Sequence, residues 1–436
     1  MSTYRPEVLR KLYNRTGFCV ETLRSSARGR PFKVFPRFGG PEQTRLTAMF
    51  SDLARQFQAL YVPTSQLLLQ SAQNRLLQHF CGGLSIETRR SKNGLNYIVV
   101  SGGGVAAANR ARGKKTLVLV HGFGSGLGFF FANYRWLSTE SYERVIAVDL
   151  LGMGGSERVS LERSPRVTTS QLMYSLFTGN VESIDDVVVP RALDFFVESI
   201  AQFCDEVIEE PKFHVAGHSL GSLLTWNYAL RHRNRVEALL MLSPCGVPSP
   251  PPGSASSQQS SSYALSTFRF LWDMNFTPQQ IVRMAGSRGL PLVTSTLRRR
   301  FNSRWNEVET DLIAHYFYHI TAAPASGEFS LNSLLRPLVY RDEDGTVSTS
   351  IFAKRPVETD IEALTPDNSL PFPVLLMFGD HDWLRFKNVE RFVALAESKG
   401  VSIKYSLIAT AGHHLYLDNP EGMHAEIQKF RDTYNV

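Results

Sequence analysis

Short runs of apolar residues recur along the chain and are separated by segments long enough to form helices. These runs are Thr116–Val120, Arg144–Val148, Phe213–Ala216, Ala238–Leu242, Pro373–Phe378 and Ser402–Ile408. A short run that is apolar throughout predicts a strand buried on both faces. Because helix-length segments separate the runs, the strands are expected to lie mostly parallel in one central sheet with helices on both sides. The sequence therefore predicts an α/β fold.

The region before the first of these runs contains both helical and alternating patterns. Residues 42–80 have apolar residues at intervals of three and four, which predicts two helices interrupted at Val62-Pro63. We expect Thr64 or Ser65 to cap the second helix. Residues 84–100 alternate between apolar and polar side chains around Asn93-Gly94, a pattern that predicts a β-hairpin.

A long interruption lies between the fourth and fifth apolar runs. Residues 247–262 are rich in Pro, Ser and Gln and cannot build a core, and residues 263–340 have a helical pattern. We interpret this block as a helical cap over the carboxyl edge of the sheet. The expected parts are a basic N-terminal segment with helices (1–80), the first part of the core (81–246), a cap or lid (247–370, with a Pro/Ser-rich loop at 248–262) and the second part of the core (371–436).

Composition limits the classes of partner and compartment. With 43% hydrophobic and 20% charged residues, the chain of 436 residues can bury a large core. The net charge of +7 favours anionic partners, and no nucleic acid partner is expected. The basic stretch from Tyr4 to Arg37 is either a frayed tail or a mitochondrial presequence. No apolar stretch is long enough to span a membrane, so we expect an intracellular protein, cytoplasmic or peripherally bound to a membrane, with the mitochondrion as the alternative.

The four cysteines are widely spaced, at Cys19, Cys81, Cys204 and Cys245. They form no C-x-x-C motif and no cluster with histidine, so they are expected to be unpaired thiols. We expect neither a metal nor a cofactor.

The segment Gly217–Gly221 has the G-x-S-x-G pattern of a nucleophile elbow, with Ser219 at its centre. The pentapeptide by itself is a weak signal, and an ordinary turn at a strand end is the alternative. Its context strengthens it, because a predicted strand precedes it and Ser222–Arg231 has helical spacing. A serine on so sharp a turn requires small residues two positions to either side, and Gly217 and Gly221 supply them.

A serine hydroxyl requires a general base and an acid that orients the base. In this arrangement the chain order is serine, acid, histidine, and both partners are expected on loops after strands. Asp380 and Asp382 follow the fifth run, and we favour Asp382 because it lies further into the loop. His413 and His414 follow the sixth run; we favour His413, which directly follows a glycine, over His414 and His381.

The oxyanion of an acyl-transfer intermediate requires two fixed N–H donors. We predict the N–H groups of Leu220, after the serine, and Phe123, in the Gly-rich segment His121–Gly124. Phosphate binding is the alternative for such a turn, but the dinucleotide-binding pattern is not fulfilled there.

Two further groups of side chains have alternative interpretations. Aromatic residues that either line an acyl-chain tunnel or pack in the core are Phe129, Phe130, Phe131, Tyr134, Trp136, Phe268, Phe270, Trp272 and Phe276. Arg298–Arg300 either meets a phosphate headgroup or forms a solvated helix face.

The chain from about Val62 onwards resembles the phospholipid-acting α/β-hydrolase-domain proteins of subfamily four/five. That group includes N-acyl-phosphatidylethanolamine deacylases and a lipid-droplet lipase co-activator. The matching motifs are VPTSQLLLQSA (62–72), HGFGSGLGFFFAN (121–133), VDLLGMGGS (148–156), FFVESI (195–200), GHSLGS (217–222), RVEALLMLSPCGVP (235–248), SGE (326–328), GDHDWL (379–384) and GHHLYLDNPE (412–421).

The resemblance implies an α/β-hydrolase fold and a lipid acyl hydrolase that works at a membrane or lipid-droplet surface. It implies the catalytic triad Ser219, Asp382 and His413. The co-activator branch has Asn in place of the nucleophile, whereas this chain keeps Ser219. Two departures are Ser222, where relatives often have a second Gly, and the polar insert at 250–262.

The family is also noted for an H-x-x-x-x-D pattern linked to acyltransferase claims. His413 to Asp418 matches this pattern. We instead interpret Asp418 to Glu421 as the start of a helix, with Asn419 as its cap and Pro420 at its first position.

Together these features predict a serine hydrolase that cleaves acyl ester or amide bonds of phospholipids or lysophospholipids through an acyl-enzyme on Ser219. The alternatives are a lysophospholipid acyltransferase, a serine peptidase of the proline-iminopeptidase type, and a non-catalytic lipase co-activator.

Overall fold

The computed structural model describes residues 62–102, 115–159, 182–256, 267–268, 271–301, 304–341 and 347–436. The predicted helix before Val62, the basic stretch from Tyr4 to Arg37, Cys19 and Phe270 lie outside the described residues.

Every apolar run predicted to be a strand is a strand of one eight-stranded sheet. The strand order is β1-β2-β4-β3-β5-β6-β10-β11. The last six strands in this order are parallel to one another, whereas β1 pairs antiparallel with β2 and β2 pairs antiparallel with β4. The bounds are β1 Ser85–Arg90, β2 Asn96–Ser101, β3 Thr116–Val120, β4 Arg144–Val148, β5 Phe213–His218, β6 Val236–Leu242, β10 Val374–Gly379 and β11 Ile403–Ile408. The predicted α/β-hydrolase fold, with its mostly parallel sheet, is therefore confirmed, as is the hairpin around Gly94, whose φ is +85°.

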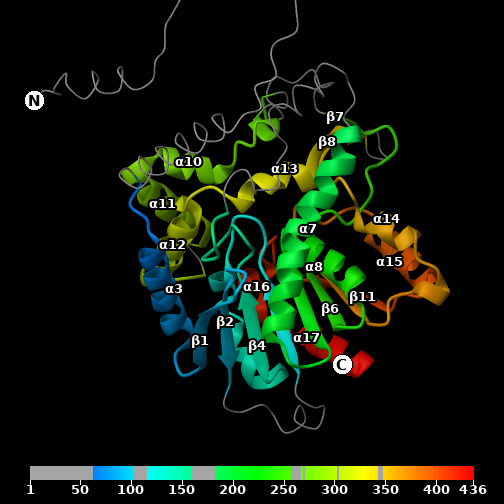
Figure 1. Cartoon of the computed structure of the whole chain (residues 1–436), viewed down its shortest axis with the longest axis horizontal. Helices are drawn as coiled ribbons and strands as arrows, with labels where there is room; N and C mark the ends of the chain where they lie inside the picture. Colours follow the sequence, from blue (N-terminus) through cyan, green and yellow to red (C-terminus); the bar gives the residue numbers. More distant parts are fainter. Residues whose placement is uncertain are drawn as a thin grey trace, which may run out of the picture. The chain divides into compact units, whose positions relative to one another are not determined.

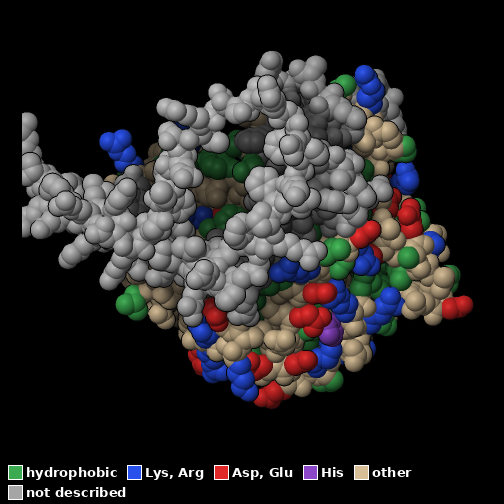
Figure 2. All heavy atoms as spheres, turned by 45° about the horizontal axis from the view of Figure 1, so that its top comes forward, with side chains coloured by type: hydrophobic (Ala, Val, Ile, Leu, Met, Phe, Trp, Pro, Cys, Tyr) green, Lys and Arg blue, Asp and Glu red, His purple; other side chains and the backbone are tan. Residues whose placement is uncertain are grey.

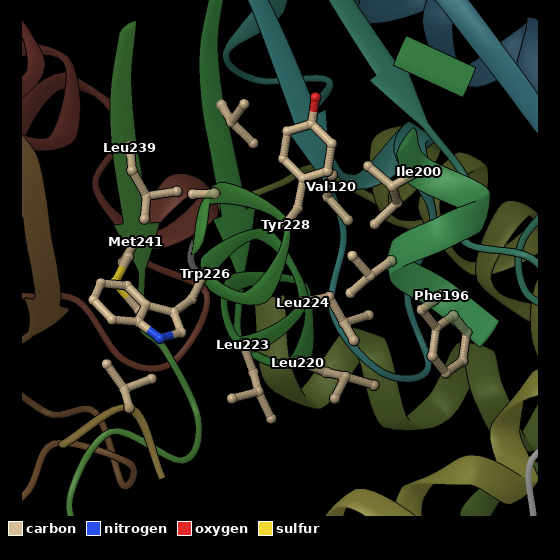
Figure 3. Packing of buried hydrophobic residues seen from close by; sticks show 14 of the residues in the cluster. Val120, Phe196, Ile200, Leu220, Leu223, Leu224, Trp226, Tyr228, Leu239 and Met241 are labelled. Atoms are coloured by element: carbon tan, nitrogen blue, oxygen red, sulfur yellow. The ribbon is translucent and has the colours of Figure 1, made fainter. Parts of the chain in front are cut away.

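Helices cover both faces of the sheet, and alternate residues of each strand supply the two cores. On β3, Val118 and Val120 belong to the core under α7 (Glu182–Val207), α8 (Leu220–Arg231) and α15 (Val389–Ser398). Figure 3 shows part of this core, with Leu220 and Leu224 of α8 on the side that faces Phe196 and Ile200 of α7. On the other face, Leu117 and Leu119 pack in a core with α3 (Gln66–Cys81) and α17 (Pro420–Tyr434).

The second predicted N-terminal helix is α3. It begins after Ser65, whose side chain accepts a hydrogen bond from the N–H of Leu68, so Ser65 rather than Thr64 is the cap. The helix lies beside α12 (Glu307–Ala322) in Figure 1.

The block between β6 and β10 is not helical throughout. Its helices are α10 (Pro278–Met284), α11 (Gly289–Phe301), α12, α13 (Leu331–Leu334) and α14 (Val357–Glu362). The prediction of helix through residue 340 is wrong at its end, because β8 (Leu335–Arg341) pairs antiparallel with β7 (Ala255–Ser256) and β9 (Val347–Ala353) in a small second sheet. The strand forms because β9, from a later part of the chain, supplies its hydrogen-bonding partner.

Short elements complete the described parts of the chain. They are α5 (Tyr134–Trp136), α16 (Leu415–Asp418), a π-helical turn η2 (Leu137–Ser141), and the 3₁₀ turns η1 (Leu127–Phe130), η4 (Gly286–Arg288), η5 (Gly327–Ser330) and η6 (Pro366–Asn368).

A buried ion pair anchors the inserted block near η5. Both guanidinium Nη atoms of Arg283 donate to the Glu328 carboxylate, at 2.7 and 2.5 Å, and the Thr277 hydroxyl donates to it at 2.7 Å. The backbone N–H of Gly327, the residue before Glu328, donates to the carbonyl of Gly152 in the loop after β4. The inserted block therefore packs against loops at the carboxyl edge of the sheet.

Surface charge is mixed over the described part of the face drawn in Figure 2. Basic and acidic side chains are interspersed there, so no broad patch of one sign covers it. Within the described segments, no helix combines the length and apolar character needed to cross a membrane.

Candidate active site

Ser219 occupies a strained turn between β5 and α8. Its φ is +54° and its ψ is −117°, a region that non-glycine residues adopt at a cost of about 1–3 kcal/mol. The turn is tight enough that a side chain on Gly217 would collide with the Gly221 backbone, and a Cβ on Gly221 would lie 2.5 Å from the carbonyl oxygen of Val120. This close approach of the backbone explains why both positions require small residues, as the motif predicted.

Asp382 and His413 come together from two distant loops. Asp382 follows β10, His413 follows β11, and the His413 Nδ1–H donates to Asp382 Oδ1 at 3.1 Å. The Asp382 side chain is fully buried and His413 is 13% exposed. This contact fixes the imidazole so that Nε2 remains available as a base.

The environment keeps Asp382 ionised. Burial alone would raise its pKa, but the hydrogen bond and charge of His413, the N–H of Leu384 at 2.9 Å and the nearby Ser243 hydroxyl together hold the pKa below the ordinary value. An anionic Asp382 can stabilise the imidazolium that forms when His413 accepts a proton.

Asp380, the other candidate acid, has a different set of partners. Its carboxylate accepts hydrogen bonds from the N–H groups of Thr410 and Ala411, at 2.8 and 2.9 Å, which lower its pKa. Asp380 thus connects the loop after β10 to the loop that carries His413.

The other candidate bases lie in unsuitable surroundings. His414 is packed against Phe129 and Tyr416, and burial, with the neighbouring His413, lowers its pKa to about 4. The His381 side chain is 78% exposed and lies 3.8 Å from Asp380.

His218 joins the serine turn to the His413 loop, a role that the sequence did not reveal. Its Nε2–H donates to the backbone carbonyl of His413 at 2.9 Å, and the two rings lie 4.8 Å apart. A carbonyl can only accept, so Nε2 carries a proton. Burial, reinforced by His413 and His414, holds the pKa of His218 well below its ordinary value, so the ring is neutral.

Ser219 directly follows His218, which is bonded to the His413 loop, but Ser219 itself makes no hydrogen bond to the proposed base in the described structure. Among the contacts of the described residues, none is a hydrogen bond from Ser219 to His413. Catalytic hydrogen bonds are commonly long in unliganded enzymes and shorten when substrate binds.

The predicted oxyanion donors occupy suitable places beside the serine. Leu220 is the first residue of α8, where a helix leaves its N–H groups without helical partners. Phe123 lies in the loop after β3, and that loop passes so close to the turn that a Cβ on Gly122 would lie 2.9 Å from Ser219 Cβ. Their role in binding an oxyanion remains a prediction.

Buried polar residues hold the loop that contains Phe123. His121 donates from Nδ1 to the Gly122 carbonyl at 2.7 Å and accepts from the Leu150 N–H at Nε2, at 3.0 Å. Asp149, fully buried, accepts from the backbone N–H of Leu127 and of Gly155, both at 2.7 Å. Asp149 was not among the site residues predicted from the sequence, although a carboxylate directly after an apolar strand is a usable signal.

The structure gives the surroundings of some members of the two side-chain groups that had alternative interpretations. Phe129, Phe130 and Tyr134 are buried in the core on the α3 side, which supports core packing for these three, whereas the buried Phe131 also lines a cleft. In α11, Arg298 pairs with Asp311 at 3.0 Å and Arg300 pairs with Asp418 at 2.7 Å.

The helix start predicted after His413 is present. Asn419 caps α17 by accepting from the Gly422 N–H at 2.8 Å, and Pro420 is the first helical residue. Asp418 accepts from the Gly412 N–H at 2.9 Å in addition to Arg300. Both contacts commit Asp418 to holding the loop of His413.

The chain is similar in sequence to proteins that are named for reactions of lipids. A profile of the alpha/beta hydrolase family matches residues 117–426. The chain is 30% identical over 326 residues to a probable 1-acylglycerol-3-phosphate O-acyltransferase of Oryza sativa subsp. japonica, covering 72% of this chain and 66% of that relative. It is 25% identical over 338 residues to the (lyso)-N-acylphosphatidylethanolamine lipase of Bos taurus, covering 76% and 82%. The chain thus spans slightly less than two thirds of the rice relative.

Among solved structures, a laboratory-evolved variant of potato epoxide hydrolase shares the fold. Its TM-score is 0.50 at 15% sequence identity, with 80% of this chain and 100% of that chain covered.

Proposed function

Because this chain belongs to the alpha/beta hydrolase family and resembles its phospholipid-acting members, we propose that it is a serine hydrolase of phospholipids or lysophospholipids. The observation that carries the proposal is the buried Asp382–His413 hydrogen bond beside a serine on a strained turn. The lipid class rests on what the relatives are named for, and the chemistry rests on the geometry.

The proposed reaction is two-step acyl transfer. Ser219 Oγ attacks the acyl carbonyl as His413 Nε2 accepts its proton, while Asp382 stabilises the imidazolium. The N–H groups of Leu220 and Phe123 bind the oxyanion. His413 then returns the proton to the leaving alcohol or amine, and water releases the acyl group from Ser219 by the same steps. A fatty acid and a deacylated lipid are the products.

An acyltransferase would use the same acyl-enzyme and replace water with a lysolipid hydroxyl. The rice relative's name favours testing this alternative. The H-x-x-x-x-D pattern does not support it as a catalytic pair, because Asp418 is occupied by Arg300 and the Gly412 N–H.

Labelling with a fluorophosphonate tests the proposed nucleophile. The wild-type chain should be labelled and Ser219→Ala should not, with both variants shown to be folded by circular dichroism. A folded wild-type chain that stays unlabelled would favour a non-catalytic lipase co-activator and refute the proposal.

Product analysis then separates the enzyme classes. Free fatty acid released from a phospholipid or lysophospholipid supports the hydrolase. Acyl transfer that appears only when a lysolipid acceptor is added indicates the acyltransferase, and cleavage of a proline amide but no lipid indicates the peptidase.

A further inference from the structure

A cleft lies beside the loops that carry Asp382 and His413. Its volume is about 960 Å³, and Ser219 is not among its lining residues. His381 and Gly412, which directly precede Asp382 and His413, contribute to its wall. The cleft is therefore a separate space beside the proposed acid and base.

One wall of this cleft is aromatic. Phe80, Phe131 and Trp305 line it and contact one another, with ring centroids 4.1 Å apart for Phe80 and Phe131 and 5.3 Å for Phe80 and Trp305. The Trp305 Nε1–H is buried and has no hydrogen-bond partner within the described structure. The Trp305 ring also carries the Arg304 guanidinium, 5.3 Å from its centroid, so the aromatic wall is continuous with a positive charge.

Three arginines from separate elements line the same cleft. Arg135 donates from Nη2 to the Gly82 carbonyl at 2.6 Å, Arg300 donates from Nη2 to Asp418, and Arg304 donates from Nη1 to the Asp418 carbonyl at 2.6 Å. A guanidinium carries five N–H groups, and these hydrogen bonds use one nitrogen of each side chain. Each arginine thus has donors left for a ligand.

The acidic residues of the cleft do not cancel this capacity. Asp418 is satisfied by Arg300 and the Gly412 N–H. The Glu421 side chain is 82% exposed and lies 4.0 Å from Arg304, so water screens it. Three arginines against two carboxylates leave the cleft with a positive balance.

From this juxtaposition of Arg135, Arg300 and Arg304 above an aromatic wall, we infer that the cleft binds a phosphate monoester. Guanidinium groups bind phosphate oxygens with paired, charge-assisted hydrogen bonds, and arginine is better suited to this than lysine. The aromatic wall suits the carbon portion of the ester. The inference does not depend on the proposed hydrolase activity, because the cleft excludes Ser219.

Binding of glycerol 3-phosphate to the full-length chain, measured by isothermal titration calorimetry, tests the site. Glycerol serves as the uncharged control ligand. We expect saturable binding that weakens as salt is added, with Arg135→Gln and Arg304→Gln each lowering affinity at least about tenfold. Arg298→Gln is the matched control, because Arg298 is an arginine of α11, paired with Asp311 outside the cleft, and its replacement should leave affinity unchanged.

A membrane arm distinguishes a free ester from a lipid headgroup. Sedimentation with phosphatidylcholine vesicles, with and without phosphatidate, is compared for the same variants. If phosphatidate vesicles bind, and Arg135→Gln and Arg304→Gln weaken that binding but Arg298→Gln does not, the phosphate comes from a lipid.

The inference is overturned if neither probe binds the wild-type chain, or if Arg298→Gln weakens binding as much as the cleft variants do. Repeating the titration on Ser219→Ala separates this outcome from failure of the hydrolase proposal, since binding should persist in that variant.

Discussion

Replacing His218 with phenylalanine tests whether this residue positions the proposed base. Phenylalanine keeps a ring of similar shape but cannot donate to the His413 carbonyl, 2.9 Å from His218 Nε2. The carbonyl would then lack its buried donor, and leaving a buried acceptor unsatisfied costs about 1–3 kcal/mol. Because the partner is the backbone of His413 itself, that cost is relieved most directly by moving the loop, which displaces the base.

The expected result is a loss of reactivity as well as stability. At 1.4 kcal/mol per tenfold, the cost corresponds to a decrease of about 5- to 150-fold in the fluorophosphonate labelling rate. His218→Gln should recover much of that rate, because its amide N–H can replace the Nε2–H donor. Urea unfolding of each variant reports the stability separately.

Two outcomes would refute the reasoning. The first is wild-type labelling by His218→Phe together with the expected loss of stability, which would make His218 a packing residue. The second is equal loss in His218→Phe and His218→Gln, which would show that the ring, and not the donated hydrogen bond, is what the loop requires.

Further predictions concern the acid, the anchor of the inserted block and pH. Asp382→Asn should lower the fluorophosphonate labelling rate roughly 10⁴-fold by stabilising the wrong imidazole tautomer of His413. Asp380→Asn, which alters only loop contacts, should lower the rate far less. Equal decreases in the two variants would contradict the assignment of Asp382 as the acid. Glu328→Gln leaves Arg283 buried without its charge partner and should lower the free energy of unfolding by about 3–5 kcal/mol, measured with urea. The double variant Arg283→Met with Glu328→Leu should recover most of the lost stability. A double variant as unstable as Glu328→Gln would argue against a coupled pair. The pKa values of buried His414 and His424 are lowered to about 4, mainly by burial. The unfolded chain therefore binds more protons between pH 6.5 and 4, and stability should fall as pH is lowered through this window, by about 2 kcal/mol per histidine at pH 5. Urea midpoints that rise from pH 7 to pH 5 would exclude this linkage.

The central sheet and the serine turn could be predicted from the amino-acid sequence. Runs such as Thr116–Val120 are apolar throughout because both faces of these strands are covered. Both the strand and its burial could therefore be predicted without knowing which strands lie beside it. The turn at Ser219 is equally local, since Gly217 and Gly221 are within two residues of the strained position.

Which side chains meet across the loops could be learned only from the folded chain. Asp380 and Asp382 are two residues apart and chemically identical, and they differ because β10 directs one toward Thr410 and the other toward His413. Strand β8 was predicted as helix for a related reason, because the strand depends on pairing with β9, which lies later in the chain.

The contact from His218 to His413, the Arg283–Glu328 ion pair and the arginine cleft are likewise pairings between segments far apart in sequence. Periodicity and motifs record the surroundings that a residue has on its own strand or helix. The identity of a partner from another loop depends on how the strands are ordered and how far each loop extends, and those distances exist only after the chain has folded.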